Sequence, residues 1–212
     1  MTADNRLGRD DVEIEAHEIV WRGYFRIDRY RVRHRLFRGG WGQAITREVF
    51  ERGHAAAVLP YDPVRDEVVL LEQFRVAALG AGAEPWLIEI VAGIIEPGET
   101  AEDVVRREAL EEADCRLAEL VPIVDAFTTP GGSSERIAIF CGRIDGQVQG
   151  GIHGLAGEGE DIRAFVEPFA SAMNRLAAGE ITNLIAVVAL QWLALNRENL
   201  RRRWLAEHGG DT

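Results

Sequence analysis

The stretch from Gly93 to Cys115 reads GIIEPGETAEDVVRREALEEADC, and more of the fold follows from it than from any other part of the chain. Pro97-Gly98 is a turn signal. Thr100 is followed three residues later by Asp103, which is the spacing of a capping box at the start of a helix. The stretch therefore predicts a helix from about Ala101 to Ala113.

The acidic residues of this predicted helix lie on its apolar side. Val104 and Val105 mark the centre of the apolar arc. At about 100° per residue, Glu108 and Glu112 fall near ~40° and ~80° from Val104, within that arc. Glu111 lies at its edge. Burial of these carboxylates without compensation would cost several kcal/mol, so the pattern is unlike that of an ordinary surface helix.

Carboxylates that repel one another at close range need a counter-charge. A hard divalent cation that takes oxygen ligands is the simplest one, and the helix is therefore interpreted as a magnesium platform. For a single glutamate at this spacing, an acidic helix with ion pairs such as that of Glu108 with Arg107 is the better interpretation. For the whole order of charges from Gly93 to Glu112 we favour the metal site, because of the family resemblance that is described below.

The composition limits the size of the protein and its partners. At 212 residues, with 47% hydrophobic residues, the chain is long enough for one substantial domain or for one domain with a small appendage. Its 24 basic and 35 acidic side chains give a net charge of -11. Phosphate contacts need a basic surface, so this balance argues against general nucleic-acid binding. An anionic substrate would need local arginines and a metal.

The cysteines and the apolar segments indicate a cytoplasmic enzyme. Cys115 and Cys141 have neither metal-ligand spacing nor a disulfide framework, which is typical of a reducing compartment, and we expect both to be inert core residues. The N-terminal sequence MTADNRLGRDD shows no secretory signal. The longest apolar run, near Leu184 to Leu195, contains Gln191 and is too short to span a bilayer, so no membrane partner is expected.

The N-terminal residues 12–50 have a strand-like pattern with Gly39-Gly40 as a turn. Alternate positions of one stretch carry Arg29, Arg31, Arg33 and Arg35. These arginines form either a solvated outer surface, which we favour, or an anion-binding wall. A small antiparallel sheet buries little surface alone, so it is expected to dock on the main domain, on a second subunit, or on both.

The remainder of the chain alternates strands with helices. Strands are predicted over residues 55–60, 67–74, 86–92, 117–128 and 137–144, and from about 162. Besides the helix at 101–113, helices are predicted over about 168–178 and 182–205, and residues 77–85 read as a loop. Strands before and after single helices fit an α+β fold in which a mixed sheet lies between helices.

Residues 150–161 read GGIHGLAGEGED and form a glycine-rich loop. On glycine content alone the loop is a flexible connection. Its acids, Glu158, Glu160 and Asp161, favour a second interpretation, in which a mobile carboxylate binds water or metal once substrate closes the site. His153 is a candidate base, but a lone loop histidine is more often structural or solvated.

The charges that follow Gly93 resemble the Nudix hydrolase box at every charged position, with Glu99, then Arg107-Glu108, then Glu111-Glu112. Where that family usually has glycine, this chain has Asp114, and aspartate tolerates a left-handed conformation better than most residues do. The departure concerns the stability of the helix and not the metal ligands.

Within the Nudix hydrolases, the chain resembles the ADP-ribose pyrophosphatases over nearly its whole length. The most specific marker is Pro130 in the stretch TTPGGSSER, for which a simple turn proline is the alternative. The resemblance implies an α/β/α sandwich with a mixed sheet and a small N-terminal antiparallel sheet. It also implies a homodimer with exchanged N-terminal strands, with residues 1–50 as the dimerisation domain and 51–212 as the catalytic domain.

The resemblance further implies Mg2+-dependent hydrolysis of the ADP-ribose pyrophosphate to AMP and ribose 5-phosphate, with Mn2+ as an alternative metal. The other interpretations are hydrolysis of another nucleoside diphosphate sugar, such as GDP-mannose, and a non-catalytic ADP-ribose-sensing module. The intact acids of the box argue against the sensing module.

The site residues implied by the resemblance fall into three groups. The catalytic group is the base Glu158 with Glu108 and Glu112. The metal ligands are Glu108, Glu111, Glu112, Glu160 and the carbonyl oxygen of Ala92. The substrate-binding group is Tyr24 on the adenine, Arg47 from the partner subunit, Arg75 and Pro130.

Overall fold

The computed structural model describes residues 6–155, 157 and 159–206. They fall into two compact units, one within residues 1–53 and 127–136 and the other within residues 54–126 and 137–212. The first unit thus contains a segment from the middle of the chain in addition to the N-terminal strands.

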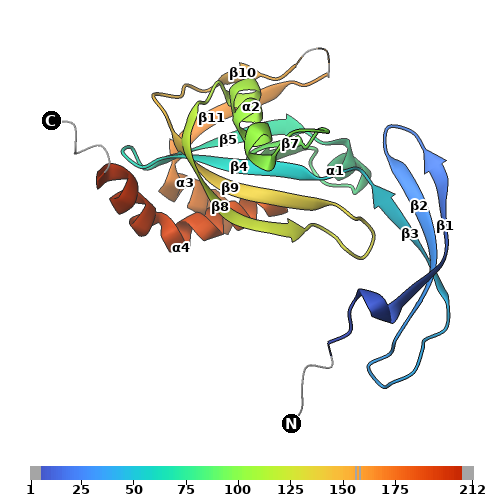
Figure 1. The fold of residues 1–212 in the computed structure, drawn as a ribbon. Coiled ribbons are helices and arrows are strands. Elements are labelled where there is room, and N and C mark those ends of the chain that lie inside the picture. The colour runs from blue at the N-terminus through green and yellow to red at the C-terminus, as the bar shows by residue number, and fades with distance from the viewer. Residues whose placement is uncertain (1–5, 156, 158, 207–212) are drawn as a thin grey trace, which may run out of the picture. The chain divides into compact units, whose positions relative to one another are not determined.

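The first unit is built on a three-stranded antiparallel sheet in the order β1-β2-β3 (Figure 1). A short 3-10 helix, Arg9–Asp11, precedes the strands β1 (Val12–Arg22), β2 (Arg26–His34) and β3 (Ile45–Glu51). The segment 127–136 is attached to β3, because the Phe50 amide donates to the Gly132 carbonyl at 2.8 Å and the Ser133 hydroxyl donates to the Phe50 carbonyl at 3.0 Å.

The arginines of β2 are paired with glutamates of the neighbouring strands. Arg29 lies between Glu18 of β1, at 3.2 Å, and Glu48 of β3, at 2.8 Å. Arg31 and Arg33 pair in the same way with Glu15 and Glu13 of β1. Exposed cross-strand pairs of this kind contribute little stability each. They favour the solvated outer surface over an anion-binding wall.

The second unit contains an eight-stranded sheet in which β10-β11-β5-β4-β9-β8 form the main path. Its strands are β4 (Ala55–Asp62), β5 (Glu67–Phe74), β6 (Trp86–Glu89), β7 (Val91–Ile94), β8 (Leu117–Phe127), β9 (Arg136–Ile144), β10 (Gly151–His153) and β11 (Ile162–Pro168). The sheet is mixed, because β4 runs parallel to β9 and antiparallel to β5 and β7.

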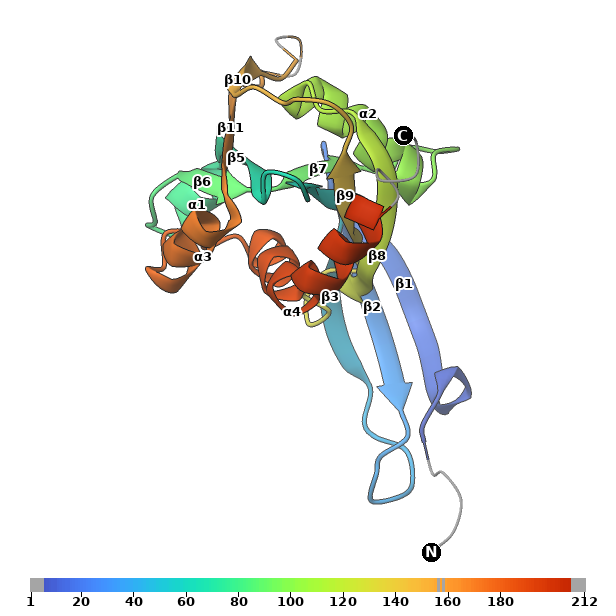
Figure 2. The same ribbon diagram turned by 90° about the vertical axis from the view of Figure 1, so that its left-hand side faces the viewer.

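Helices cover both faces of this sheet (Figures 1 and 2). The helices of this unit are α1 (Val76–Gly80), α2 (Ala101–Ala113), α3 (Phe169–Ala177) and α4 (Leu184–Ala206). Helix α2 packs on one face, and α3 and α4 pack on the other. The α+β sandwich with a small additional antiparallel sheet is therefore confirmed. Among the described residues, no helix combines the length and the apolar character that crossing a membrane requires.

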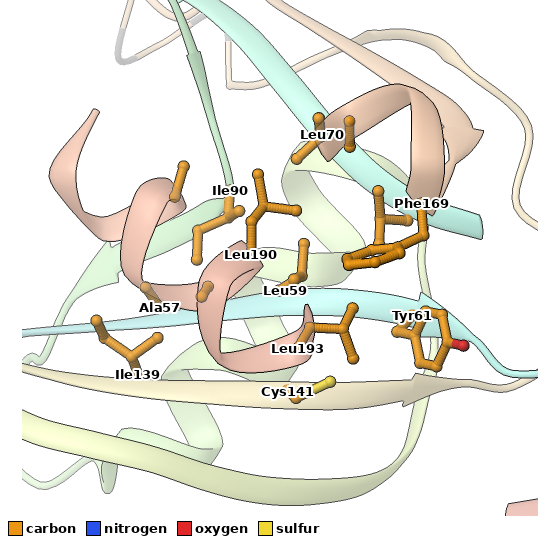
Figure 3. Packing of buried hydrophobic residues seen from close by; sticks show 14 of the residues in the cluster. Ala57, Leu59, Tyr61, Leu70, Ile90, Ile139, Cys141, Phe169, Leu190 and Leu193 are labelled. Atoms are coloured by element: carbon orange, nitrogen blue, oxygen red, sulfur yellow. The ribbon is translucent and has the colours of Figure 1, made fainter. Parts of the chain in front are cut away.

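Strand β4 separates the two hydrophobic clusters because successive side chains of a strand point to opposite faces. Ala57, Leu59 and Tyr61 face α3 and α4, whereas Ala56 and Val58 face α2. Figure 3 shows the first cluster, in which Leu190 and Leu193 of α4 lie over the β4 side chains. Each fully buried aliphatic side chain contributes about 1.5–3 kcal/mol relative to exposure.

Both cysteines are core residues, as the sequence predicts. Cys115 and Cys141 are free and fully buried. Burial raises the pKa of the Cys115 thiol to about 12 and also raises the pKa of Cys141, so neither is a reactive thiolate near neutral pH.

The structure differs from the sequence prediction in three local features, the first of which is that the predicted loop 150–161 contains the short strand β10, Gly151–His153. The single strand predicted over 86–92 is two strands, because β6 pairs with β5 and β7 pairs with β4, and the buried Ile90 lies between them. The loop predicted over 77–85 begins with the short helix α1. The other predicted strands and helices are confirmed to within a few residues at each end.

The two ends of α2 are as predicted. The Thr100 hydroxyl oxygen accepts from the Asp103 amide at 3.2 Å, and the Asp103 carboxylate accepts from the Thr100 amide at 3.0 Å, which completes the capping box. Asp114 ends the helix in the left-handed conformation, with φ 46° and ψ 41°.

This left-handed position gives a test of the helix end. Asp114→Gly is expected to stabilise the protein by about 0.5 kcal/mol, because glycine adopts the conformation without the Cβ penalty, less the entropy that glycine loses on folding. Asp114→Ala is expected to destabilise it by about 1 kcal/mol, because alanine keeps the penalty and lacks the local hydrogen bonding of aspartate. Urea unfolding midpoints of the three proteins measure both effects. The opposite order of the two variants would contradict this account of the helix end.

Candidate active site

Glu112 is the most deeply buried acid of α2, with 3% of its surface exposed. Its Oε2 atom accepts a hydrogen bond from the Ala92 amide of β7 at 3.1 Å. Burial raises the pKa of Glu112 to about 8, and the charges of Glu108 and Glu160 act in the same direction, against the hydrogen bond from Ala92. The orientation predicted from the helical arc, with this carboxylate turned towards the core, is confirmed.

Glu108 lies directly against the backbone of β7. A Cβ atom on Gly93 would fall 1.9 Å from the Glu108 Oε1 atom, so a side chain at position 93 would displace the carboxylate. Burial raises the pKa of Glu108 as well, against the effect of Arg107. The first glycine of the motif is therefore required by the position of Glu108, and not by the shape of a turn.

Arg107 is the counter-charge on the more exposed side of α2. Its guanidinium binds Glu99 at 3.0 Å, Glu108 at 2.8 Å and Glu111 at 3.1 Å. The ion-paired acidic helix and the buried carboxylates are thus both present. In the described part of the chain, no three Asp, Glu, His or Cys side chains are gathered so that they could hold a metal ion as they stand.

The glycine-rich loop brings Glu160 to these acids. The Glu160 carboxylate accepts from the Leu155 amide at 3.1 Å, and its charge raises the pKa of both Glu108 and Glu112. The Gly154 amide donates to the Glu111 carbonyl at 3.4 Å, which attaches the start of the loop to α2. Of the two interpretations of this loop, the position of Glu160 favours the one in which the loop carries a carboxylate to α2.

The other polar residues of this loop have different surroundings. Glu158, the expected base, lies outside the described residues. Asp161 is exposed. His153 pairs with Ile162 across β10 and β11, and its Nε2 atom is buried without a hydrogen bond to any described residue.

Arg75 lies at the end of β5, where it is the N-cap residue of α1. Its Nη2 atom is 2.7 Å from the carboxylate of Glu89, the last residue of β6. Burial lowers the pKa of Arg75, but the hydrogen bond and charge of Glu89 raise it above the ordinary value, and the charges of Glu112 and Glu160 add to this. Arg75 therefore belongs to the electrostatic surroundings of the α2 acids.

Glu89 was missed by the sequence analysis. Its signal was an acid inside the apolar stretch WLIEIVAG, at a place where the predicted strand gave no reason for a charge. It is buried, with 4% of its surface exposed.

The remaining predicted substrate-binding residues lie in the first unit. Tyr24 is 87% exposed. Its ring and that of Phe25 lie edge to face, with their centroids 4.7 Å apart. Arg47 is exposed on β3, and its Nη1 atom donates to the Thr46 carbonyl at 2.8 Å. Pro130 lies in the turn of the segment 127–136. The structure thus groups Glu108, Glu111, Glu112, Glu160 and Arg75 in one unit, and Tyr24, Arg47 and Pro130 in the other.

The structure thus combines a mixed sheet between helices with a helix, α2, whose acids pack against the strand that carries Gly93. This chain belongs to the Nudix family, since the family model described as NUDIX domain matches residues 43–185.

Among curated proteins, the chain is 51% identical over 198 residues to the ADP-ribose pyrophosphatase of Escherichia coli K12, covering 93% of this chain and 95% of that protein. It is 40% identical over 207 residues to the ADP-ribose pyrophosphatase of Haemophilus influenzae, covering 96% and 95%. The GDP-mannose pyrophosphatase of Cronobacter sakazakii is 35% identical over 150 residues, covering 70% and 78%.

The fold is also similar to that of a crystal structure described as ADP compounds hydrolase. The two align with a TM-score of 0.67 at 20% identity, covering 97% of this chain and 99% of that one.

The buried carboxylate gives a test that needs no substrate. Glu112→Gln is expected to raise the melting temperature of the metal-free protein at about pH 8 and to change it little at about pH 5. The folded-state pKa of about 8 lies above the ordinary 4.5, so the folded protein holds a proton that the unfolded chain releases. Stability is therefore lost as the pH rises between these values, and the neutral amide avoids the loss.

Thermal unfolding in EDTA across this pH range measures the effect. Glu102→Gln, at an exposed position of the first turn of the same helix, is the matched control and should show no gain at high pH. Parallel stability curves for the wild type and Glu112→Gln would contradict the raised pKa.

Proposed function

We propose that this chain is a Mg2+-dependent hydrolase that cleaves the pyrophosphate of ADP-ribose to AMP and ribose 5-phosphate. The observation that carries the proposal is the buried Glu112 together with the partly buried Glu108, both with raised pKa values, next to Glu160 and Arg75. The substrate is supported by the 51% identity with the E. coli ADP-ribose pyrophosphatase over nearly the whole length of both chains.

The types of donor fit a divalent cation, and the described side chains would have to move closer together to bind one. Carboxylate oxygens are the ligands that Mg2+ prefers, and Glu108 and Glu112 are held where a positive charge would offset the cost of their ionisation. We assign the metal to Glu108, Glu111, Glu112, Glu160 and the carbonyl oxygen of Ala92, with Mn2+ as an alternative ion. A bound cation would neutralise charge that develops on the phosphate oxygens.

The chain's own residues supply the rest of the chemistry. The Arg75 guanidinium binds the pyrophosphate oxygens and orients them. Glu158 takes a proton from a water molecule as its oxygen attacks phosphorus. The bond from that phosphorus to the bridging oxygen breaks, and the bridging oxygen leaves with the second phosphate. No covalent enzyme intermediate forms.

The first unit supports a dimer with exchanged N-terminal strands. Every residue of β1 is exposed, including the large apolar side chains Ile14 and Trp21, at 62% and 54%. A sheet of three strands has little stability by itself, and burial of these side chains on a second subunit would stabilise it. We assign dimerisation to residues 1–50 and catalysis to residues 51–212.

In the proposed dimer the first unit completes the substrate site. Tyr24 stacks on the adenine, Pro130 lies in a loop that contacts substrate, and Arg47 reaches the site of the other subunit. Nucleic acid and membrane are not among the proposed partners, given the net charge of -11. The two buried, unpaired cysteines support a cytoplasmic location.

A panel of nucleotide sugars assayed with Mg2+, with products separated by chromatography, tests the function. ADP-ribose should be hydrolysed far faster than GDP-mannose or NADH, with AMP and ribose 5-phosphate as products. Faster hydrolysis of GDP-mannose would overturn the substrate assignment, and tight binding of ADP-ribose without turnover would favour the sensing module.

Glutamine variants of Glu158 and Glu160 distinguish the proposed roles of these two loop acids. Glu158→Gln should lower kcat by ~100- to ~10,000-fold, with little change in the Mg2+ requirement, because a general base acts in the transition state. Glu160→Gln should instead raise the Mg2+ concentration needed for half-maximal rate. Steady-state kinetics at a series of Mg2+ concentrations measures both. If Glu158→Gln loses only metal affinity, or loses nothing, the base lies elsewhere.

Shared sites in the dimer are tested by mixing two inactive variants. In a dimer refolded from Arg47→Ala and Glu112→Gln chains, one site receives both native residues. Half of the dimers in an equal mixture are mixed, so about a quarter of wild-type activity should return. The control carries both substitutions in one chain and should recover nothing. A monomer by light scattering would refute the shared site.

A further inference from the structure

Glu89 is a buried acid to which the proposed reaction gives no role. It ends β6, and both of its carboxylate oxygens are engaged. Its hydrogen-bond donors are Gln73 at 3.2 Å, Arg75 at 2.7 Å for the shortest contact, and Asn183 at 3.1 Å. Burial of an ionised carboxylate is costly unless it is paired, so a carboxylate retained here must serve its donors.

The contact with Arg75 fixes the plane of the guanidinium. Nε lies 3.2 Å from both oxygens of Glu89, and Nη2 lies 2.7 Å from Oε2. Two N–H groups held by one carboxylate define an orientation that a single contact would not. The Arg75 side chain is nevertheless 45% exposed, so the contact with Glu89 leaves part of this side chain accessible.

Asn183 also donates a hydrogen bond to Glu89, and its own side chain is held in place by the start of α4. Its Oδ1 atom accepts from the Ile185 amide at 3.0 Å and from the Ala186 amide at 3.1 Å, which caps the start of α4. This cap fixes which end of the side-chain amide is oxygen, so Nδ2 must point to Glu89. The orientation of Glu89 is therefore set by a helix terminus and not by a flexible side chain.

The chemistry of this cluster requires a carboxylate and not an amide at position 89. The groups of Arg75 and Asn183 that contact Glu89 are N–H donors, and the side-chain NH2 group of Gln73 is a third donor. A carboxylate accepts on both oxygens, whereas an amide would turn an NH2 group towards at least one of these donors. Glu89→Gln is thus nearly equal in size but loses part of the hold on Arg75.

We propose that Glu89 is a positioning residue, which holds the Arg75 guanidinium beside the α2 acids so that the accessible part of Arg75 meets the pyrophosphate of the substrate. The inference rests on the proposed function, since it concerns the arginine of that site. Glu89 itself touches neither substrate nor metal. Its effect passes through Arg75, and the network links the reacting phosphates to β5, β6 and the start of α4.

A double-mutant cycle tests this route. Glu89→Gln and Arg75→Ala should each lower kcat/KM for ADP-ribose by about 10- to 100-fold, the range expected for charged hydrogen bonds. In the double variant, Glu89→Gln should add no further loss, because the residue through which it acts is gone. Glu72→Gln is the matched control, since Glu72 lies on the neighbouring strand and pairs with Arg163. It should stay within about twofold of the wild type.

A purely structural role for Glu89 makes different predictions. Glu89→Gln would then lower the melting temperature. It would either keep kcat/KM within about twofold of the wild type, or lower kcat/KM by the same factor in the Arg75→Ala background as in the wild type. Each of these two kinetic results would overturn the proposal. Arg75→Lys tests the same point without altering the buried acid. It keeps the charge but lacks the planar fork, so it should also lose about tenfold or more, and full activity would count against the proposal.

The position of Arg75 can also be observed without substrate. In 15N-labelled protein, the Arg75 Nε–H resonance, identified by its loss in Arg75→Lys, should exchange slowly in the wild type and in Glu72→Gln and rapidly in Glu89→Gln. A slow signal that survives Glu89→Gln would overturn the proposal. A wild type with the slow signal but no hydrolysis of ADP-ribose would refute the proposed function and leave the hold of Glu89 on Arg75 supported.

Discussion

The second unit depends on one constraint, which is that α2 turns two carboxylates towards the sheet on which it packs. An ionised carboxylate under a helix is unfavourable unless something compensates it. The protein compensates with a backbone N–H from Ala92, with Arg107 of the same helix and with Arg75 at the end of β5. The remaining deficit appears as the raised pKa of Glu112. Apolar residues at these positions would pack without this cost, and the proposed metal site accounts for the acids that stand there instead.

The neighbouring elements follow from the same constraint. Gly93 has no side chain because the Glu108 carboxylate occupies that volume. The partner switch at Ile90 lets β6 carry Glu89 beside β5 while β7 runs under α2. The C-terminal helix, on the other face of the sheet, contributes through the Asn183 cap. The helices on both faces of the sheet therefore contribute to the placement of the charged residues on the α2 side.

The parts of the fold that were predictable from sequence are those with local physical causes. The capping box of Thr100 and the left-handed end at Asp114 depend on residues within one turn, and the inward acids follow from helical periodicity alone. The division of 86–92 into two strands was not predictable, because it depends on which distant strand each half pairs with. The ion-pair partners of the β2 arginines likewise depend on strand register, which places Glu18 and Glu48 opposite Arg29 and Glu13 opposite Arg33. Glu89 was missed because its donors are distant in sequence, up to Asn183.

The proposed metal site requires Glu112, whose pKa is raised by burial, to ionise when Mg2+ binds, and calorimetric titration with Mg2+ tests this requirement most directly. Titrations at pH 7 in two buffers of different ionisation enthalpy give the number of protons released on binding. The account predicts release of nearly one proton at about pH 7 and almost none at about pH 9, where Glu112 is already ionised. Binding of Mg2+ at pH 7 without proton release would contradict it.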